Sequence, residues 1–172
     1  MTLDLRDFVR DVPDFPSPGI LFRDITPLLA SPEAFHSAVL AMAEPFRERP
    51  PDKVLGIEAR GFMFGAAIAR ELGVGFVPVR KPGKLPRETF RVSYGLEYGK
   101  DSLEIHTDAC RAGETVLIAD DVLATGGTAQ AAGELADRLG ARVAGMTFFI
   151  ELQGLNGRAL LTSRRLHSVL LL

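Results

Sequence analysis

The chain has 172 residues, of which 47% are hydrophobic, so it is long enough for a single domain with one well-buried core. Its 22 acidic and 20 basic residues give a net charge of -2, which provides no overall positive field for nucleic acid or an anionic membrane. The one cysteine, Cys110, excludes an intramolecular disulfide, and no cluster of histidine and cysteine has the spacing of zinc ligands.

The N-terminal residues are charged rather than apolar. Asp4, Arg6, Asp7 and Arg10 lie where a signal peptide would have its apolar segment, and no stretch of about twenty apolar residues follows. We therefore expect a cytoplasmic protein that has neither nucleic acid nor a membrane as a partner.

From residue 31 onward, helical and strand patterns alternate. Ser31-Pro32-Glu33 has the residues of a helix start, and apolar residues at three- and four-residue spacings extend this helix to about residues 45–50. The other expected elements are strands at 54–57, 76–79, 116–119 and 143–150, and helices at 61–72 and 128–139. Strands that alternate with helices of this length predict an α/β fold in which helices flank a parallel sheet.

Two parts of the chain do not follow this alternation. Residues 80–102 are basic and contain prolines and glycines, and they are too long and polar for an ordinary connection, so we expect a flexible lid loop. The proline-rich segment 12–27 precedes the sheet and is expected to cover the site. The expected organisation is one domain over residues 1–172, with a small hood made of about residues 1–30 and 151–172.

The segment 116–128 combines an apolar strand, two carboxylates and a glycine-rich turn. Open α/β sheets bind ligands beyond the carboxyl ends of their strands, which is where Asp120 and Asp121 follow the apolar run. The Thr-Gly-Gly-Thr turn at 125–128 offers hydroxyls and accessible N–H groups, and the helix after it points its positive end at the same place. The simpler alternative is a tight strand-to-helix turn with an N-capping aspartate.

This segment resembles the motif of type I phosphoribosyltransferases that binds phosphoribosyl pyrophosphate (PRPP). The resemblance implies that Asp120 and Asp121 bind the ribose hydroxyls and favour cationic character at the anomeric carbon. It also implies that the 5′-phosphate is held by Ala124, Thr125, Gly126, Gly127 and Thr128. A parallel sheet flanked by helices, with a small hood and a flexible lid loop, is the fold implied by this family.

Two further groups of charges are candidates for pyrophosphate binding. Arg60 is expected at the same edge of the sheet as Asp120, and its planar guanidinium can bind two phosphate oxygens. The alternative is a surface pair between Arg60 and Glu58. Cations at 81–87 could stabilise a departing pyrophosphate, although such a run read alone is more typical of a solvated surface.

The Ser-Tyr-Gly-Leu-Glu-Tyr-Gly segment at 93–99 contains a candidate acid between two glycines. A flap bounded by glycines can cover a reacting centre and exclude water. Glu97 could donate a proton to a heterocycle nitrogen, or it could be an ordinary exposed acid.

Several segments together resemble the branch of this family that acts on adenine, namely residues 15–27, 58–62, 80–86, 94–99 and 119–128. The resemblance implies an adenine site framed by Leu21, Phe22, Arg23 and Leu152, with Glu97 as the acid that serves the base. It implies that pyrophosphate is faced by Ala59, Arg60, Lys81, Lys84, Arg87 and Tyr98. Read alone, Phe22 and Leu152 are more typical of core residues, and the match is poor beyond Gly157.

The resemblance implies a purine-salvage enzyme that transfers the 5-phosphoribosyl group of PRPP to adenine, giving AMP and pyrophosphate. Mg²⁺ is expected as the cofactor, bound through substrate oxygens and water rather than directly by side chains. The family also implies a homodimer. Two alternatives remain open: the same reaction on a 6-oxopurine such as hypoxanthine or xanthine, and a non-enzymatic PRPP sensor, for which the chain lacks a separate DNA-binding module.

Overall fold

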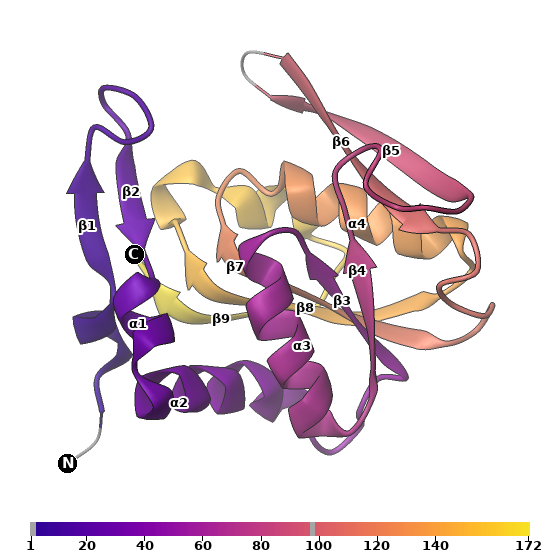
Figure 1. Ribbon diagram of the computed structural model, residues 1–172, viewed down its shortest axis with the longest axis horizontal. Coiled ribbons are helices and arrows are strands. Elements are labelled where there is room, and N and C mark those ends of the chain that lie inside the picture. The colour runs from indigo at the N-terminus through magenta and orange to yellow at the C-terminus, as the bar shows by residue number, and fades with distance from the viewer. Residues whose placement is uncertain (1–2, 97–98) are drawn as a thin grey trace.

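A computed structural model describes residues 3–96 and 99–172 of the chain (Figure 1). Its centre is a parallel sheet with the strand order β4-β3-β7-β8-β9. In that order the strands are β4 (Gly75–Val79), β3 (Lys53–Ile57), β7 (Thr115–Leu123), β8 (Arg142–Glu151) and β9 (Leu166–Leu171). Helices flank this sheet, so the predicted α/β fold is confirmed.

Helices cover both faces of the sheet. The α-helices of the described residues are α1 (Thr26–Ala30), α2 (Pro32–Ala43), α3 (Arg60–Leu72) and α4 (Gly127–Arg138). Short 3₁₀ helices are η1 (Leu5–Phe8), η2 (Glu44–Phe46), η3 (Gln153–Leu155) and η4 (Gly157–Leu161). The predicted start of α2 is confirmed, because the Ser31 hydroxyl accepts a hydrogen bond of 3.2 Å from the Ala34 N–H.

The central strand β7 separates two apolar layers. Val116 and Ile118 are buried in the layer shared with α4, whereas Leu117 and Ala119 are buried in the layer shared with α1, α2 and α3. A parallel strand that is buried on both faces needs this continuous apolar run. The next residue, Asp120, therefore emerges at the carboxyl end of the sheet.

Two antiparallel hairpins lie outside the central sheet. One joins β1 (Arg10–Pro13) to β2 (Leu21–Asp24), and the other joins β5 (Thr89–Leu96) to β6 (Gly99–His106). The prediction of a loop over residues 80–102 is therefore wrong from Thr89 onward. In this second hairpin the alternating apolar residues pack on the layer under α4: Phe90, Val92, Leu103 and Ile105.

The C-terminal part of the chain also differs from expectation. Strand β9 pairs in parallel with β8, so the expected hood stretch 151–172 includes a strand of the central sheet. Figure 1 shows β1 and β2 beside the edge of the sheet at which the chain ends. Within residues 3–96 and 99–172, the structure has no helix of the length and apolarity needed to cross a membrane.

Candidate active site

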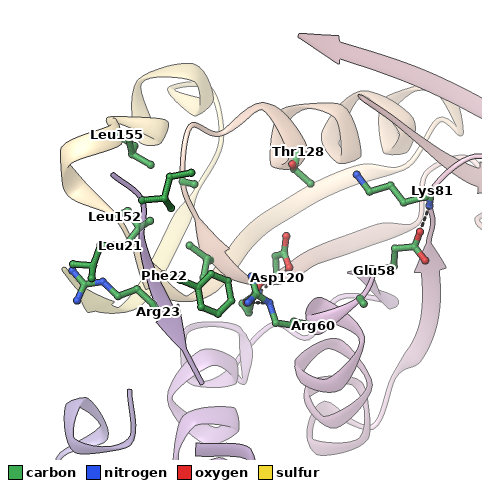
Figure 2. A pocket seen from close by; sticks show the side chains of 15 residues that line it. Leu21, Phe22, Arg23, Glu58, Arg60, Lys81, Asp120, Thr128, Leu152 and Leu155 are labelled. Carbon is green, nitrogen blue, oxygen red and sulfur yellow. Dashed lines mark hydrogen bonds and ion pairs between the residues drawn. The ribbon is translucent and has the colours of Figure 1, made fainter. Parts of the chain in front are cut away.

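An open crevice of about 460 Å³ lies where β3, β7 and β8 end, with β2 on one side (Figure 2). It brings together residues that are far apart in the sequence. The predicted site residues that line it are Leu21, Phe22, Arg23, Ala59, Arg60, Lys81, Asp120, Asp121, Ala124, Thr128 and Leu152. Residues from each expected group, for the base, the ribose and the pyrophosphate, thus share one cavity.

The acidic pair lies on the floor of the crevice and is almost completely buried. Asp120 is 9% exposed and Asp121 is 5% exposed, and the Asp121 N–H donates to Asp120 Oδ1 at 2.9 Å. Burial, with the adjacent Asp121 carboxylate adding to it, raises the pKa of Asp120 well above its ordinary value. The pair therefore resists carrying two full negative charges until cations approach it.

Arg60, the first residue of α3, supplies one such cation. Its Nε lies 2.6 Å from Asp121 Oδ2 in an ion pair. The N-terminal end of α3 approaches β7 closely, because a Cβ added at Gly61 would lie 2.7 Å from Asp120 Oδ1. The alternative pairing of Arg60 with Glu58 is not the one that the structure shows.

The turn after β7 forms a second, smaller cavity of about 60 Å³ beside the crevice. Thr125, Gly126 and Thr128 line it, just before and within the first turn of α4. The first N–H groups of a helix have no acceptor within the helix, so they are available to an anion at this place. The predicted phosphate-binding turn thus has a suitable cavity and suitable donors.

Apolar side chains form the opposite wall. The Arg60 Cζ lies 5.0 Å from the centroid of the Phe22 ring, and Phe15 packs edge-on against the same ring at 5.1 Å. Leu152 and Leu155 lie across from Glu58 and Lys81 (Figure 2). Phe22 is thus half-buried and lines the crevice, and it is not part of either apolar layer.

Glu58 joins the end of β3 to the basic segment. Its carboxylate accepts from the Lys81 N–H at 2.5 Å and from Arg80 Nη2 at 3.2 Å, with Lys84 Nζ at 3.4 Å. Burial acts to raise the pKa of Glu58, but these hydrogen bonds outweigh it and hold the pKa below its ordinary value. Glu58 is therefore a charged acceptor that positions the backbone around Lys81.

A second network connects the basic segment to the β5–β6 hairpin. Lys81 Nζ forms an ion pair with Asp101 and lies 3.3 Å from the Tyr94 hydroxyl. The Tyr94 hydroxyl donates to Asp101 at 3.1 Å and accepts from the Thr128 hydroxyl at 3.3 Å. One hydrogen-bonded chain therefore links the expected pyrophosphate cation to the expected phosphate turn.

Some predicted residues do not line the crevice. Lys84 lies near Glu58, and Arg87 pairs with Asp108 at the surface. Glu97 and Tyr98 lie outside the described residues. Their roles toward substrate stay predictions.

The sequence interpretation missed three features of the crevice. The sequence pattern pairs Glu58 only with Arg60 and places Tyr94 only in a flap. Leu155 lines the crevice from the tail, where the resemblance gave no assignment. The alternation of apolar residues around Tyr94 was a usable signal, whereas nothing in the sequence pattern marks Leu155.

The chemistry of the acidic pair fits a hard divalent cation bound beside it. Mg²⁺ prefers oxygen ligands and keeps several waters, and the carboxylates offer oxygens next to the cavity. In the described part of the chain, no three His, Cys, Asp or Glu residues are grouped in a way that could hold a metal ion by themselves.

A parallel sheet with an acidic pair at the end of its central strand, followed by a glycine-rich turn, defines the class of phosphoribosyltransferases. A family model described as the phosphoribosyl transferase domain matches residues 28–152. An adenine phosphoribosyltransferase of Carboxydothermus hydrogenoformans is 58% identical over 97% of this chain and 98% of its own length. The chain therefore belongs to the adenine phosphoribosyltransferase family.

Solved structures agree with this assignment. The adenine phosphoribosyltransferase of Rhodothermus marinus superposes with a TM-score of 0.94 at 53% identity, covering 98% of this chain and 96% of that one. The Saccharomyces cerevisiae enzyme, solved with an imino-altritol bisphosphate and adenine, gives a TM-score of 0.91 at 44% identity, with 96% of each chain covered. The resemblance seen in the sequence is thus confirmed across the fold.

Proposed function

We propose that this chain transfers the 5-phosphoribosyl group of PRPP to adenine and releases pyrophosphate, forming AMP for purine salvage. One observation carries the proposal: an aromatic wall and an acidic pair line one crevice, and the glycine-rich turn forms a smaller cavity directly beside it. A flat purine fits against Phe22, the ribose lies over Asp120 and Asp121, and the 5′-phosphate enters the turn at 124–128.

The charges of the crevice suit a dissociative transfer. When the bond to pyrophosphate breaks, positive charge grows at the anomeric carbon near the acidic pair, and negative charge grows on the leaving group near Lys81 and Arg60. Interactions that strengthen in this way lower the barrier rather than only tighten binding. Asp120 and Asp121 are the residues beside which Mg²⁺ would be held, through substrate oxygens and water, and when bound it would supply further neutralisation of the leaving group.

We also propose that the active form is a cytoplasmic homodimer that uses small molecules only. The family resemblance and the near-neutral net charge support this proposal. Analytical ultracentrifugation of the full chain should give twice the monomer mass, and a monomer with full activity would contradict the homodimer.

The first experiment is an assay of nucleotide and pyrophosphate formation from PRPP with adenine, guanine, hypoxanthine or xanthine, each with Mg²⁺ or with a chelator. Magnesium-dependent turnover confined to adenine is the expected result. Turnover of a 6-oxopurine would leave the phosphoribosyl chemistry intact and contradict the assigned base. PRPP binding without turnover of any base would favour a regulatory sensor.

A further inference from the structure

The segment that follows β8 is closed into a loop by an ion pair between the buried Glu151 carboxylate and the half-exposed Arg158 side chain. Arg158 donates to both oxygens of Glu151, from Nε at 2.9 Å and from Nη2 at 2.6 Å. The Ser168 hydroxyl, on β9, donates to the same carboxylate at 2.6 Å. The Glu151 side chain is only 9% exposed, and the Arg158 guanidinium holds its pKa below the ordinary value, so the pair is charged at neutral pH.

This closed loop, residues 151–158, contacts the crevice at two separate places. Leu152 and Leu155 line the wall expected to contact adenine. At the other end, Gly157 packs against the phosphate turn so closely that an added Cβ would lie 2.2 Å from the Ala124 carbonyl oxygen. In return, a Cβ added at Gly126 would lie 2.5 Å from the Gly157 carbonyl oxygen.

The contact also fixes the backbone of the turn. Gly126 has a φ of 89°, a backbone conformation that residues with a Cβ rarely adopt. The backbone N–H of Leu152 donates to the Leu123 carbonyl at 2.9 Å, which holds the start of the loop beside the strand that carries the turn. The loop and the turn are therefore in contact at both ends, and neither can shift alone.

We propose that Glu151, Arg158 and Gly157 are positioning residues that hold the adenine wall and the 5′-phosphate turn in a fixed relation to each other. None of the three is required to touch the reacting atoms. If the loop 151–158 is released, the adenine wall and the 5′-phosphate turn are both displaced. The loop carries the adenine wall, and it packs against the turn. This inference rests on the proposed function, since it takes the two surfaces to bind the two ends of one nucleotide.

The test compares Arg158→Gln with Arg47→Gln. Arg47 also pairs with acidic side chains, but its partner Glu71 lies near the end of α3 that is opposite to Arg60, away from the crevice. Isothermal titration calorimetry would measure the Kd of adenine and of ribose 5-phosphate separately. Loss of alignment at a site typically has effects on the order of tenfold to a hundredfold, and we expect Arg158→Gln to weaken both probes by about tenfold.

A second pair of variants tests the packing directly. Gly157→Ala and Gly154→Ala add the same methyl group within one segment, but the added group meets the turn at Gly157 and open space at Gly154. We expect Gly157→Ala to weaken both probes, and Gly154→Ala to leave both affinities unchanged. If Gly157→Ala does not fold, the comparison of Arg158→Gln with Arg47→Gln decides the question.

The outcomes separate a positioning role from a purely structural one. The proposal is supported if Arg158→Gln raises the KM values of adenine and PRPP together, while kcat changes less and Arg158→Lys restores part of the loss. It is overturned if Arg158→Gln lowers Tm but leaves both Kd values unchanged, or if adenine alone is affected. A wild-type protein that binds both probes but makes no AMP would contradict the proposed function and leave this comparison decisive.

Discussion

Asp120 shows how a functional carboxylate can reduce stability. Its pKa is raised in the folded protein, first by burial and then by Asp121, whereas an unfolded aspartate has a pKa of about 3.9. The folded state therefore binds the proton more tightly than the unfolded state does. The stability linked to this proton is present below the unfolded pKa and is lost as pH rises through the folded pKa.

We therefore expect Asp120→Asn to raise Tm at neutral pH while it lowers turnover. The amide oxygen can still accept from the Asp121 N–H without the cost of a buried charge. A gain of about 1 kcal/mol would correspond to roughly 2–4 °C, measured by differential scanning calorimetry. The gain should shrink as pH falls below about 3.9, the unfolded pKa, where the wild-type carboxyl becomes protonated in both states.

Asp121→Asn is the matched control for this prediction. It removes the charge that pairs with Arg60, so it should not raise Tm in the same way. A rise in Tm that is equal for both variants, or independent of pH, would contradict the assignment of the effect to the buried Asp120 proton.

Glu97 carries a prediction that depends on the family resemblance, because it lies outside the described residues. If it serves the base as an acid, Glu97→Gln should lower kcat by about 10² to 10⁴, the range of general acid catalysis, with a smaller effect on the Kd of AMP. Rapid-quench measurement of AMP formation would test this. Glu88→Gln, at an exposed position before the same hairpin, is the control, and an unchanged kcat would remove Glu97 from the mechanism.

Single side chains were harder to place from the sequence than the motifs that contain them. The acidic pair and the turn at 124–128 are contiguous, so their neighbourhood is set by local chain geometry. The partners of Arg60 and Glu58 come from β7 and from the basic segment, and only the packed sheet determines those pairings. Sequence reasoning therefore located the charges but not their counterions.

At the scale of elements, the β5–β6 hairpin links two ends of the crevice. Tyr94 reaches from it to Thr128 on α4 and to the Asp101–Lys81 pair, while Arg138 on α4 donates to the Arg91 carbonyl at 2.8 Å. Tyr94 and Arg91 therefore fasten the described part of the hairpin to α4. A rearrangement of Lys81 toward pyrophosphate requires exchange of its contact with Asp101.

We expect Tyr94→Phe to raise the KM of PRPP by a few fold with little change in the KM of adenine. Each lost hydrogen bond contributes about 0.5–1.5 kcal/mol, and the phenyl ring keeps its packing against the turn. Steady-state kinetics with each substrate varied would show the split. Ser93→Ala, which removes a hydroxyl bonded at 2.8 Å to Ser102 in the same hairpin, should leave both values unchanged. Equal changes for the two variants would point to general loosening of the hairpin.

The expected elements were recovered best where apolar runs are long. The strands at 54–57, 116–119 and 143–150 are buried on both faces over most of their length, and Thr147 is the one polar residue in these segments. The composition of residues 80–102 predicts a loop, because charged residues alternate with the apolar residues of β5 and β6 and prolines precede the hairpin. Strand β9 lies at the sheet edge, where a mixed sequence is tolerated.

At the scale of the whole molecule, ligand binding should raise the free energy of unfolding and therefore Tm. AMP would bind only the folded chain, because the parts of the binding site lie far apart in the sequence. The wall of the site comes from β2 and the loop 151–158, and its floor and phosphate turn come from β7 and the residues that follow it. At about 100 times its Kd, AMP should add about 2.7 kcal/mol, or roughly 5–10 °C in Tm. Thermal melts with AMP and with IMP would measure this, and an equal shift from both would contradict selection of the adenine base.

Most residues that face the crevice lie near or beyond the carboxyl ends of strands, or in the hood, and outside the two buried layers. Asp120 follows Ala119, and Glu58 follows Ile57, each directly after a fully buried apolar residue. The choice of the base that accepts the phosphoribosyl group and the folding of the chain therefore depend on different sets of residues. Mutation can alter these sets independently. Substitutions confined to residues 20–23 and 152–155 can change which base is accepted while the apolar layers beneath remain intact. The fold is therefore suited to the evolution of new base specificities through changes in these two segments alone.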